Sequence, residues 1–224
     1  MNLHCFDLGL IEYSQALCLQ EELLRRRYQE EYEDSLLLLE HPPVFTLGRG
    51  GNAKHLLSPR DVPVYRVGRG GDITFHGPGQ LVGYPIIDLT RHGRDVHAYL
   101  RGLEAVLIEA LAQVGIAAQR MEGLTGVWLE HQKIASIGIG VRRWITCHGF
   151  ALNVDPDLTY FSQIIPCGLT GVQMTSMGKA LTQPIAMVAV KSLVATVFAR
   201  YFGYKEIVWQ RNFLMPDLVN VASQ

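Results

Sequence analysis

The chain has four cysteines, and two of them lie where a thiol is placed to do chemistry. Cys167 sits between a proline and a glycine in the segment Ile164-Ile-Pro-Cys-Gly-Leu-Thr-Gly171, which is typical of a reactive loop held by a rigid scaffold. Cys147 adjoins a histidine, but neighbouring side chains of a strand point to opposite faces, so Cys147 and His148 are not expected to meet. The sequence therefore favours Cys167 as the nucleophile. With no C-x-x-C spacing, all four thiols are expected to be free and mostly buried.

Two further polar side chains lie in segments that are otherwise small or apolar. Lys133 heads the run Lys133-Ile-Ala-Ser-Ile-Gly-Ile-Gly140, and it must either point to solvent at a strand end or face a polar cavity. His76 is followed by Gly-Pro-Gly, and a histidine among glycines is expected to reach a cleft. If the lysine approached a cysteine, its ammonium would favour the thiolate and lower the thiol pKa, as nucleophilic catalysis near neutral pH requires.

The glycine-rich stretch Arg69-Gly-Gly-Asp-Ile-Thr-Phe-His-Gly-Pro-Gly-Gln80 does not match a nucleotide-binding loop. The dinucleotide fingerprint needs a third glycine where Ile73 stands, and a strand-like run follows in place of a helix. A phosphate-binding G-x-x-x-x-G-K-[ST] motif is also missing from the sequence. The related runs Leu47-Gly-Arg-Gly-Gly and Val67-Gly-Arg-Gly-Gly are interpreted as two similar strand-ending turns.

Composition and charge exclude several classes of protein. Twenty Lys and Arg against 21 Asp and Glu give a formal net charge of -1, which indicates neither a nucleic-acid partner nor a polyphosphate ligand. The scattered histidines form no H-x-x-x-H or H-E-x-x-H pattern, so no metal site is expected. The first residues do not form a signal peptide, and no apolar run approaches the length of a membrane span. We expect one cytoplasmic domain over residues 1–224.

Two types of hydrophobic periodicity place these motifs on secondary structure. Amphipathic helices are predicted over 13–32, with Ser14 as N-cap, over 95–114, with Gly115 as the stop, and from near Pro184 to Tyr201. Strands are predicted over these ranges: 35–40, 44–47, 62–67, 72–75, 81–89, 116–119, 126–130, 133–141 and 145–154. Pro85 is expected to confine its strand to an edge or a bulge. Helices flank the strands without alternating with them, which predicts an α+β fold with an antiparallel or mixed sheet.

Four motifs together resemble one family, the octanoyltransferases of lipoate biosynthesis. They are Arg69–Gln80, Lys-Ile-Ala-Ser-Ile-Gly-Ile at 133–139, His-Gly-Phe-Ala-Leu-Asn-Val at 148–154 and Pro-Cys-Gly-Leu-Thr-Gly at 166–171. Their order and spacing fit the family, whose pattern is clearest over residues 34–177. The resemblance implies a fold similar to that of the biotin and lipoate protein ligases, with a mixed sheet and packed helices, and no cofactor.

The resemblance also implies a set of site residues. Cys167 would be the acyl-accepting nucleophile, Lys133 would lower its pKa, and Lys133 or His76 would serve as a base. The acyl-binding residues would be Arg69, Gly70, Gly71, Asp72, Ile73, Thr74, Phe75, His76, Ser136, Ile137, Gly138, Gly149, Phe150 and Ala151. Glycines let a backbone run close to a thin apolar chain. We therefore expect Gly149→Val to block acylation while leaving the fold intact.

The activity that the resemblance implies is transfer of an octanoyl group through a cysteine thioester. Its donor would be octanoyl-acyl carrier protein. Its acceptors would be lysines in the lipoyl domains of 2-oxoacid dehydrogenase subunits and in the glycine cleavage H protein. The alternatives are an ATP-dependent lipoate protein ligase, an amidotransferase that moves octanoyl groups between lipoyl domains, a cysteine hydrolase and a non-catalytic binding module.

Overall fold

The computed structural model describes residues 1–59, 61–168, 171–181, 183 and 185–210, without the side chain of Cys167. A mixed sheet runs through this part of the chain in the order β12-β1-β2-β6-β10-β9-β8-β7, and β11 pairs with β9. β1 pairs in parallel with β2 and β12, as β11 does with β9, and the other neighbours are antiparallel. The strands are β1 (Asn2–Leu10), β2 (Ser35–Glu40), β6 (Gln80–Ile86), β7 (Gln119–Met121), β8 (Leu124–Leu129), β9 (Gln132–Arg142), β10 (Ile145–Asn153), β11 (Gln173–Met174) and β12 (Glu206–Gln210).

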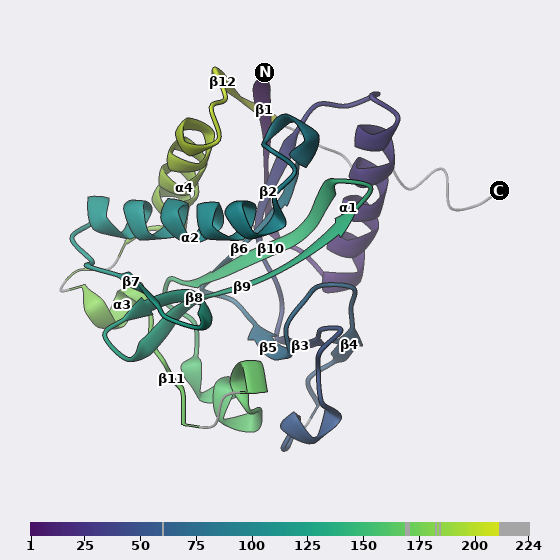
Figure 1. Cartoon of the computed structure of the whole chain (residues 1–224). Helices are drawn as coiled ribbons and strands as arrows, with labels where there is room; N and C mark the ends of the chain where they lie inside the picture. The colour runs from purple at the N-terminus through teal and green to yellow at the C-terminus, as the bar shows by residue number, and fades with distance from the viewer. Residues whose placement is uncertain (60, 169–170, 182, 184, 211–224) are drawn as a thin grey trace.

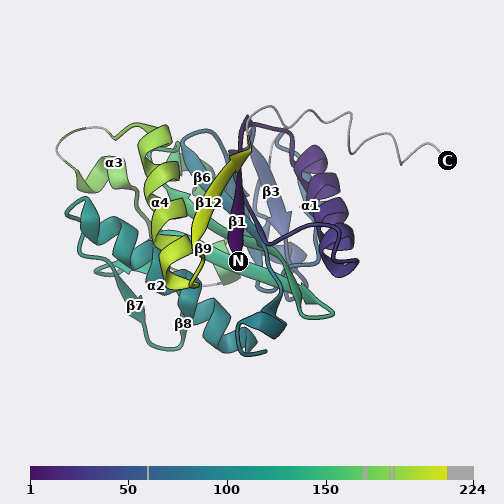
Figure 2. The same ribbon diagram turned by 90° about the horizontal axis from the view of Figure 1, so that it is seen from above.

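Helices cover both faces of this sheet. Figures 1 and 2 show α2 and α4 on one face and α1 on the other. The four leucines of β2 are buried on both sides, because Leu36 and Leu38 pack with α2 and α4 whereas Leu37 and Leu39 pack with α1. The helices are α1 (Tyr13–Tyr28), α2 (Val96–Gln113), α3 (Met177–Ala180) and α4 (Met187–Tyr201).

A second, smaller sheet lies beside the first and carries the glycine-rich motifs (Figure 1). Its order is β4-β3-β5, and the two Gly-Arg-Gly-Gly turns lie against each other: Arg49 N donates to Arg69 O at 2.9 Å, and Gly50 N to Gly71 O at 3.2 Å. The related runs thus form one double turn that caps this sheet. The elements of this region are β3 (Val44–Leu47), η1 (Ala53–His55), β4 (Val64–Arg66), β5 (Ile73–His76), η3 (Leu158–Gln163) and η4 (Pro166–Gly168). The short helix η2 (Leu89–Arg91) lies between β6 and α2 and packs in the core of the main sheet.

The helix ends agree with the sequence predictions in part. The helix predicted to start at Asp95 begins at Val96, with Asp95 as its N-cap accepting hydrogen bonds from His97 N and Ala98 N. Ser14 is not the N-cap of α1, because the helix begins one residue earlier at Tyr13. That helix also ends at Tyr28 rather than residue 32, since the glutamates that follow would oppose the negative end of the helix dipole. The predicted helix start at Pro184 lies outside the described residues.

Pro85 corrects one prediction, because its strand lies inside the sheet and not at an edge. β6 pairs with β2 on one side and β10 on the other, but the pairing with β10 covers only Gln80 to Gly83 of β6. Beyond Gly83, side-chain hydrogen bonds of Thr146 replace the backbone hydrogen bonds between β6 and β10. The Thr146 hydroxyl donates to Pro85 O at 2.7 Å and accepts from Ile87 N at 3.0 Å. A proline is tolerated here because the missing N–H falls where the two strands have separated.

The predicted α+β class with a mixed sheet is confirmed, in a single domain. The strands β1 and β12 were not predicted. Within the described ranges, no helix combines the length and the apolar character needed to cross a membrane.

Candidate active site

A cavity of about 240 Å³ lies between the two sheets. Its walls come from the double turn and β5, from the facing strands β9 and β10, from the β7–β8 turn, and from single residues of α1 and β6. Chain segments far apart in sequence therefore meet here. The predicted site residues that line it are Arg69, Gly71, Asp72, Ile73, Thr74, His76, Lys133, Ser136, Ile137, Gly138, Gly149, Phe150 and Ala151.

Two predicted acyl-binding residues do not line the cavity. Phe75 packs away from it, stacked on Tyr160 with ring centroids 4.5 Å apart, because the alternation of β5 turns Thr74 and His76 toward the cavity. Gly70 faces β9, where its N–H donates to Ile139 O at 2.8 Å.

Lys133 is 2% exposed, so it faces the cavity and not solvent. Its ammonium lies over the ring of Trp128, with Nζ 5.2 Å from the centroid. The stem passes Gly126: a Cβ on that glycine would lie 2.6 Å from Cε and 3.3 Å from Nζ of the lysine. Gly126 N in turn donates to the fully buried carboxylate of Glu104 at 3.0 Å. Helix α2 therefore helps to fix the strand on which the lysine packs.

The segment that carries Cys167 meets the residues of the cavity wall at two points after the cysteine. Cys167 lies within η4, and the next residue is so close to the wall that a Cβ on Gly168 would lie 2.7 Å from Asp72 Oδ2. Farther on, Met174 pairs with Lys133 in the β11–β9 ladder, and Thr175 N donates to Lys133 O at 3.0 Å. The chain that follows Cys167 therefore runs back to the strand that carries Lys133.

His76 is held by hydrogen bonds at both ring nitrogens. Gln80 Oε1 lies 2.8 Å from Nδ1 and Thr46 Oγ1 lies 3.3 Å from Nε2. Thr46 Oγ1 also accepts from the buried Arg69 Nη2 at 2.9 Å, so its own proton is free to point at Nε2. These partners place the ring proton on Nδ1. Burial, with the charges of neighbouring groups, lowers the pKa of His76 to about 3, so the ring is neutral at pH 7.

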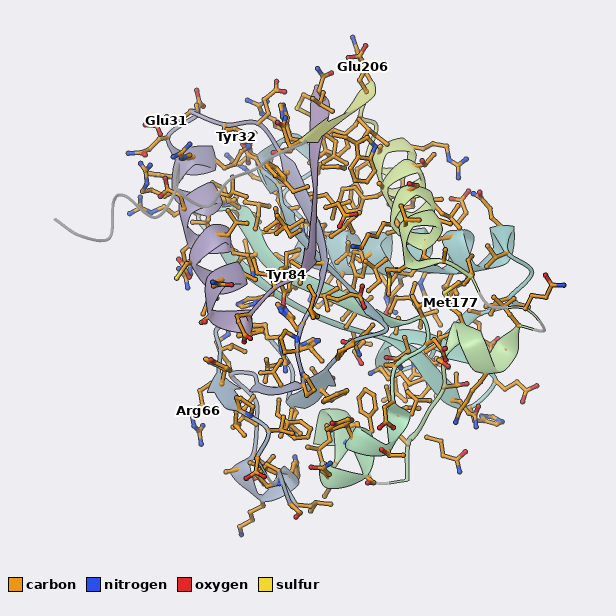
Figure 3. All side chains as sticks on the ribbon, turned by 180° about the vertical axis from the view of Figure 1, so that it is seen from behind. Glu31, Tyr32, Arg66, Tyr84, Met177 and Glu206 are labelled. Atoms are coloured by element: carbon orange, nitrogen blue, oxygen red, sulfur yellow. The ribbon has the colours of Figure 1, made fainter. Side chains whose placement is uncertain are left out.

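Three cavity residues that sequence reasoning did not select are also aromatic and polar: Tyr13, Tyr84 and His148. Figure 3 shows Tyr84 well inside the molecule. Its hydroxyl lies 2.8 Å from Nε2 of His41, a buried residue that does not line the cavity. Burial raises the pKa of Tyr13 to about 12 and lowers that of His41 to about 4, so both side chains are neutral near pH 7. The charged side chain on this side of the cavity is Arg69, which donates to Thr46 beside His76.

His148 combines a strained backbone with an unpaired ring nitrogen. Its φ of 56° is in the left-handed region although the residue lies in the middle of β10. The side chain is 3% exposed, and none of the described residues hydrogen-bonds to Nδ1. Burial lowers the pKa of His148 to about 4. A polar side chain in the apolar strand 145–154 was the sequence signal that could have identified it.

Cys147 is excluded from the cavity as expected from its position next to His148. It packs in the core under α1, and burial raises the pKa of its thiol to about 11. Cys5 is likewise buried, whereas Cys18 is exposed on α1. The thiol side chain of Cys167 lies outside the described part of the chain.

Gly149 corrects the expectation that a valine there would leave the fold intact. A Cβ at this position would collide with the backbone oxygen of Gly83 and would lie 2.6 Å from Cδ of Pro85. A rigid strand cannot yield at such a contact as a side-chain tip can. The glycine is therefore required by strand packing, and Gly149→Val is expected to destabilise the protein.

Comparisons with known proteins agree with this geometry. Residues 12–199 match the family described as the lipoyl protein ligase A/B catalytic domain. An octanoyltransferase of Geobacter sulfurreducens is 52% identical over 193 residues, covering 86% of this chain and 82% of the relative. An octanoyltransferase of Gloeobacter violaceus is 51% identical, covering 87% of this chain and 88% of the relative.

Solved structures show the same fold at low sequence identity. A lipoate-protein ligase A bound with ATP superposes with a TM-score of 0.80 at 15% identity, covering 99% of this chain and 93% of the other. The bi-partite lipoate protein ligase of Thermoplasma acidophilum gives 0.78 at 16% identity, with 99% and 91% covered. A biotin protein ligase of Aquifex aeolicus gives 0.54 at 12% identity, with 90% and 70% covered. The fold is that of the lipoate and biotin protein ligases, and the chain belongs to the octanoyltransferases of the lipoyl protein ligase A/B family.

Proposed function

We propose that this octanoyltransferase works in two half-reactions through a thioester on Cys167. The thiolate attacks the thioester carbonyl of octanoyl-acyl carrier protein, the carrier thiolate leaves, and an S-octanoyl enzyme forms. A lysine amine of a lipoyl domain then attacks this thioester and forms an amide. The observation that carries the proposal is that the Cys167 segment meets the wall that holds Lys133 at two points after the cysteine.

Lys133 would supply the positive charge that favours the thiolate. Lys133 is buried with its ammonium over Trp128, and its strand pairs with Met174, seven residues after Cys167. A cation a few ångströms from a thiol lowers the thiol pKa by one to three units. No ATP is needed for the second half-reaction, because forming an amide from a thioester is downhill.

The acyl chain would lie along the predicted binding residues, between the double turn and the facing glycines of β9 and β10. Gly138 has no room for a side chain, since its Cβ would lie 3.0 Å from Cδ of Arg69. Thr74 adds a polar group: its hydroxyl lines the cavity and has no hydrogen-bond partner among the described residues. Backbone N–H groups of the glycine-rich turns, together with this hydroxyl, are our candidates for the oxyanion donors.

His76 is better suited to shaping the cavity than to moving a proton. Both of its ring nitrogens are engaged, and its pKa of about 3 leaves almost no driving force to accept a proton at pH 7. Lys133 would have to give up the proton that activates the thiol before it could act as a base.

The acceptors that we propose are lipoyl domains of 2-oxoacid dehydrogenase subunits and the glycine cleavage H protein, in the cytoplasm. One catalytic domain over residues 1–224 would suffice. A ligase would activate free octanoate with ATP, and an amidotransferase would take its octanoyl group from another lipoyl domain. Supplying each donor in turn to the same lipoyl domain separates the three activities, and release of free octanoate would indicate a hydrolase.

The test of the proposed function is the intact mass of the protein after incubation with octanoyl-acyl carrier protein. The wild type and Cys147→Ala should gain one octanoyl group, whereas Cys167→Ala should gain none. An adduct that persists in Cys167→Ala would overturn the assignment of the nucleophile. The octanoyl group should then pass to an added lipoyl domain, and an acyl-enzyme that does not react with it would exclude the second step.

A further inference from the structure

The two half-reactions place different demands on a base. In the first, the nucleophile is a thiolate, which has no proton to lose. In the second, the acceptor lysine arrives as an ammonium and must lose two protons before a neutral amide is formed. One proton leaves to solvent to give the attacking amine, and the other leaves the tetrahedral adduct. A base near Cys167 is therefore needed for transfer to the lipoyl domain and not for acylation.

A histidine–aspartate pair lies against the Cys167 segment. His55 Nδ1 and Asp72 Oδ2 form a short contact, and Asp72 Oδ1 accepts from Ile73 N at 2.7 Å and from Asn52 N at 3.1 Å. Because both carboxylate oxygens are engaged, the carboxylate is fixed and can hold the proton of His55 on Nδ1. No described residue hydrogen-bonds to Nε2, which leaves that nitrogen as the acceptor.

This pair is close to the residue that follows the nucleophile. A Cβ on Gly168 would lie 2.7 Å from Asp72 Oδ2 and 3.1 Å from His55 Cε1. The backbone fixes the pair from the other side as well, because Ile165 N donates to His55 O at 2.8 Å. Consecutive Cα atoms are about 3.8 Å apart, so the Cα of Cys167 lies within roughly 8 Å of the ring.

The exposure of the two side chains matches the path of a large substrate. Asp72 lines the cavity and is 11% exposed, whereas His55 does not line it and is 24% exposed. The acyl chain fills the cavity from within, but a lysine on a folded lipoyl domain must approach the thioester from outside. A base on the outer side of the Cys167 segment is placed to meet it.

We propose that His55, oriented by Asp72, is the general base of the second half-reaction; this inference rests on the proposed function. The amine nitrogen of the acceptor lysine attacks the carbonyl carbon of the Cys167 thioester and forms the C–N bond. The remaining ammonium proton of the adduct passes to His55 Nε2, and Asp72 stabilises the imidazolium. The C–S bond then breaks with its electron pair on sulfur, which regenerates the thiolate, and His55 releases its proton to solvent.

The competing interpretation is that the pair only anchors the Cys167 segment. His55→Asn separates the two, because its side-chain amide can still donate to Asp72 but cannot accept a proton. His97→Asn, an exposed histidine at the start of α2, is the matched control and should leave both steps unchanged.

The experiment measures the two half-reactions separately. Acylation by octanoyl-acyl carrier protein is followed by intact mass, and the isolated octanoyl-enzyme is then mixed with a lipoyl domain. In His55→Asn the transfer rate should fall about 100-fold, far more than the acylation rate, and added imidazole should restore part of it. Asp72→Asn should slow transfer as well, because the ring then carries its proton on the wrong nitrogen.

Each other result contradicts the proposal in its own way. Transfer at the wild-type rate in His55→Asn would exclude the base. Loss of both half-reactions in His55→Ala, with recovery of both in His55→Asn, would show an anchor. A transfer defect that imidazole does not relieve would also count against it. If the wild type forms no octanoyl-enzyme at all, the proposed function fails first and this inference with it.

Discussion

The cavity has two walls that differ in the ionisable side chains they carry. The reactive wall consists of Lys133 and Asp72, which are side chains of opposite charge type, and Gly168 of the Cys167 segment lies against Asp72. The histidine wall consists of Tyr13, His76, Tyr84 and His148, all polar but uncharged near pH 7. Along β9 they are well separated, because His148 pairs with Ile139, six positions from Lys133 and so roughly 20 Å away.

The difference shows that burial alone does not make a polar group catalytic. On the histidine wall, desolvation holds the histidines neutral, and hydrogen bonds to Thr46, Gln80 and His41 fix the rings and hydroxyls in place. On the reactive wall, Lys133 lies over Trp128, on the strand that pairs with the chain after Cys167. We infer that the histidine wall gives the cavity its shape and that proton transfer belongs to the reactive wall.

The largest expected effect comes from removing the cation of the reactive wall. Lys133→Ala should reduce thiolate formation at pH 7 and slow acylation by about 100-fold, because a nearby positive charge shifts a thiol pKa by one to three units. Alkylation of Cys167 should move to higher pH in the variant. The exposed Lys179→Ala is the control. An unchanged alkylation profile would remove Lys133 from this role and weaken the contrast between the walls.

The histidine wall should make the stability of the folded protein sensitive to acid. The pKa of His76 is about 3 in the folded protein, below the value near 6.5 expected in the unfolded chain. The unfolded state therefore binds more protons as the pH falls below 6.5, and folding loses stability. Between pH 7 and pH 5 this one ring should cost about 2 kcal/mol of the free energy of unfolding.

Urea unfolding at the two pH values measures this cost. His76→Gln keeps a neutral amide in the place of the ring, so its free energy of unfolding should fall by about 2 kcal/mol less than that of the wild type. Equal losses in the two proteins would mean that His76 titrates normally. The histidine wall would then be a place where protons are exchanged.

Much of the scaffold follows from local sequence signals. The cap at Asp95 and the alternation in 133–141 depend on neighbouring residues, so α2 and β9 were predicted nearly in full. The parallel pairing of β1 with β12 joins Asn2 to Glu206, and no local pattern encodes such a contact. Pro85 misled for the same reason, because Thr146, sixty-one positions away, supplies the compensating hydrogen bond.

The site was predictable only where one motif carried several of its residues. The stretch 69–76 and the residues 136–138 of β9 were assigned from the family resemblance of their motifs, and the structure places most of them around the cavity. Tyr13 and Tyr84 had no such signal, because a tyrosine in a helix or strand is usually a core residue. His55 lay in an ordinary loop, and only folding brings it to Asp72 and Gly168.

The smallest expected effect tests how the reactive wall holds its lysine. Gly126→Ala places a methyl group 2.6 Å from Lys133 Cε, at a φ of 119° that side chains rarely adopt. The ammonium must shift by a fraction of an ångström, and acylation should slow about tenfold while the histidine wall is untouched.

Gly93→Ala is the matched control, because it also replaces a glycine of positive φ but meets nothing within 4 Å. Both variants should lose about 1 kcal/mol of stability through backbone strain. Gly126→Ala should lose more than Gly93→Ala, because its Cβ would also lie 2.6 Å from the backbone oxygen of Ala135. Only Gly126→Ala should change the pH dependence of Cys167 alkylation. If the two variants acylated equally fast, the position of Lys133 would not depend on Gly126. Acylation would then be insensitive to a small displacement of the Lys133 ammonium, and the shape of the cavity would limit its rate instead.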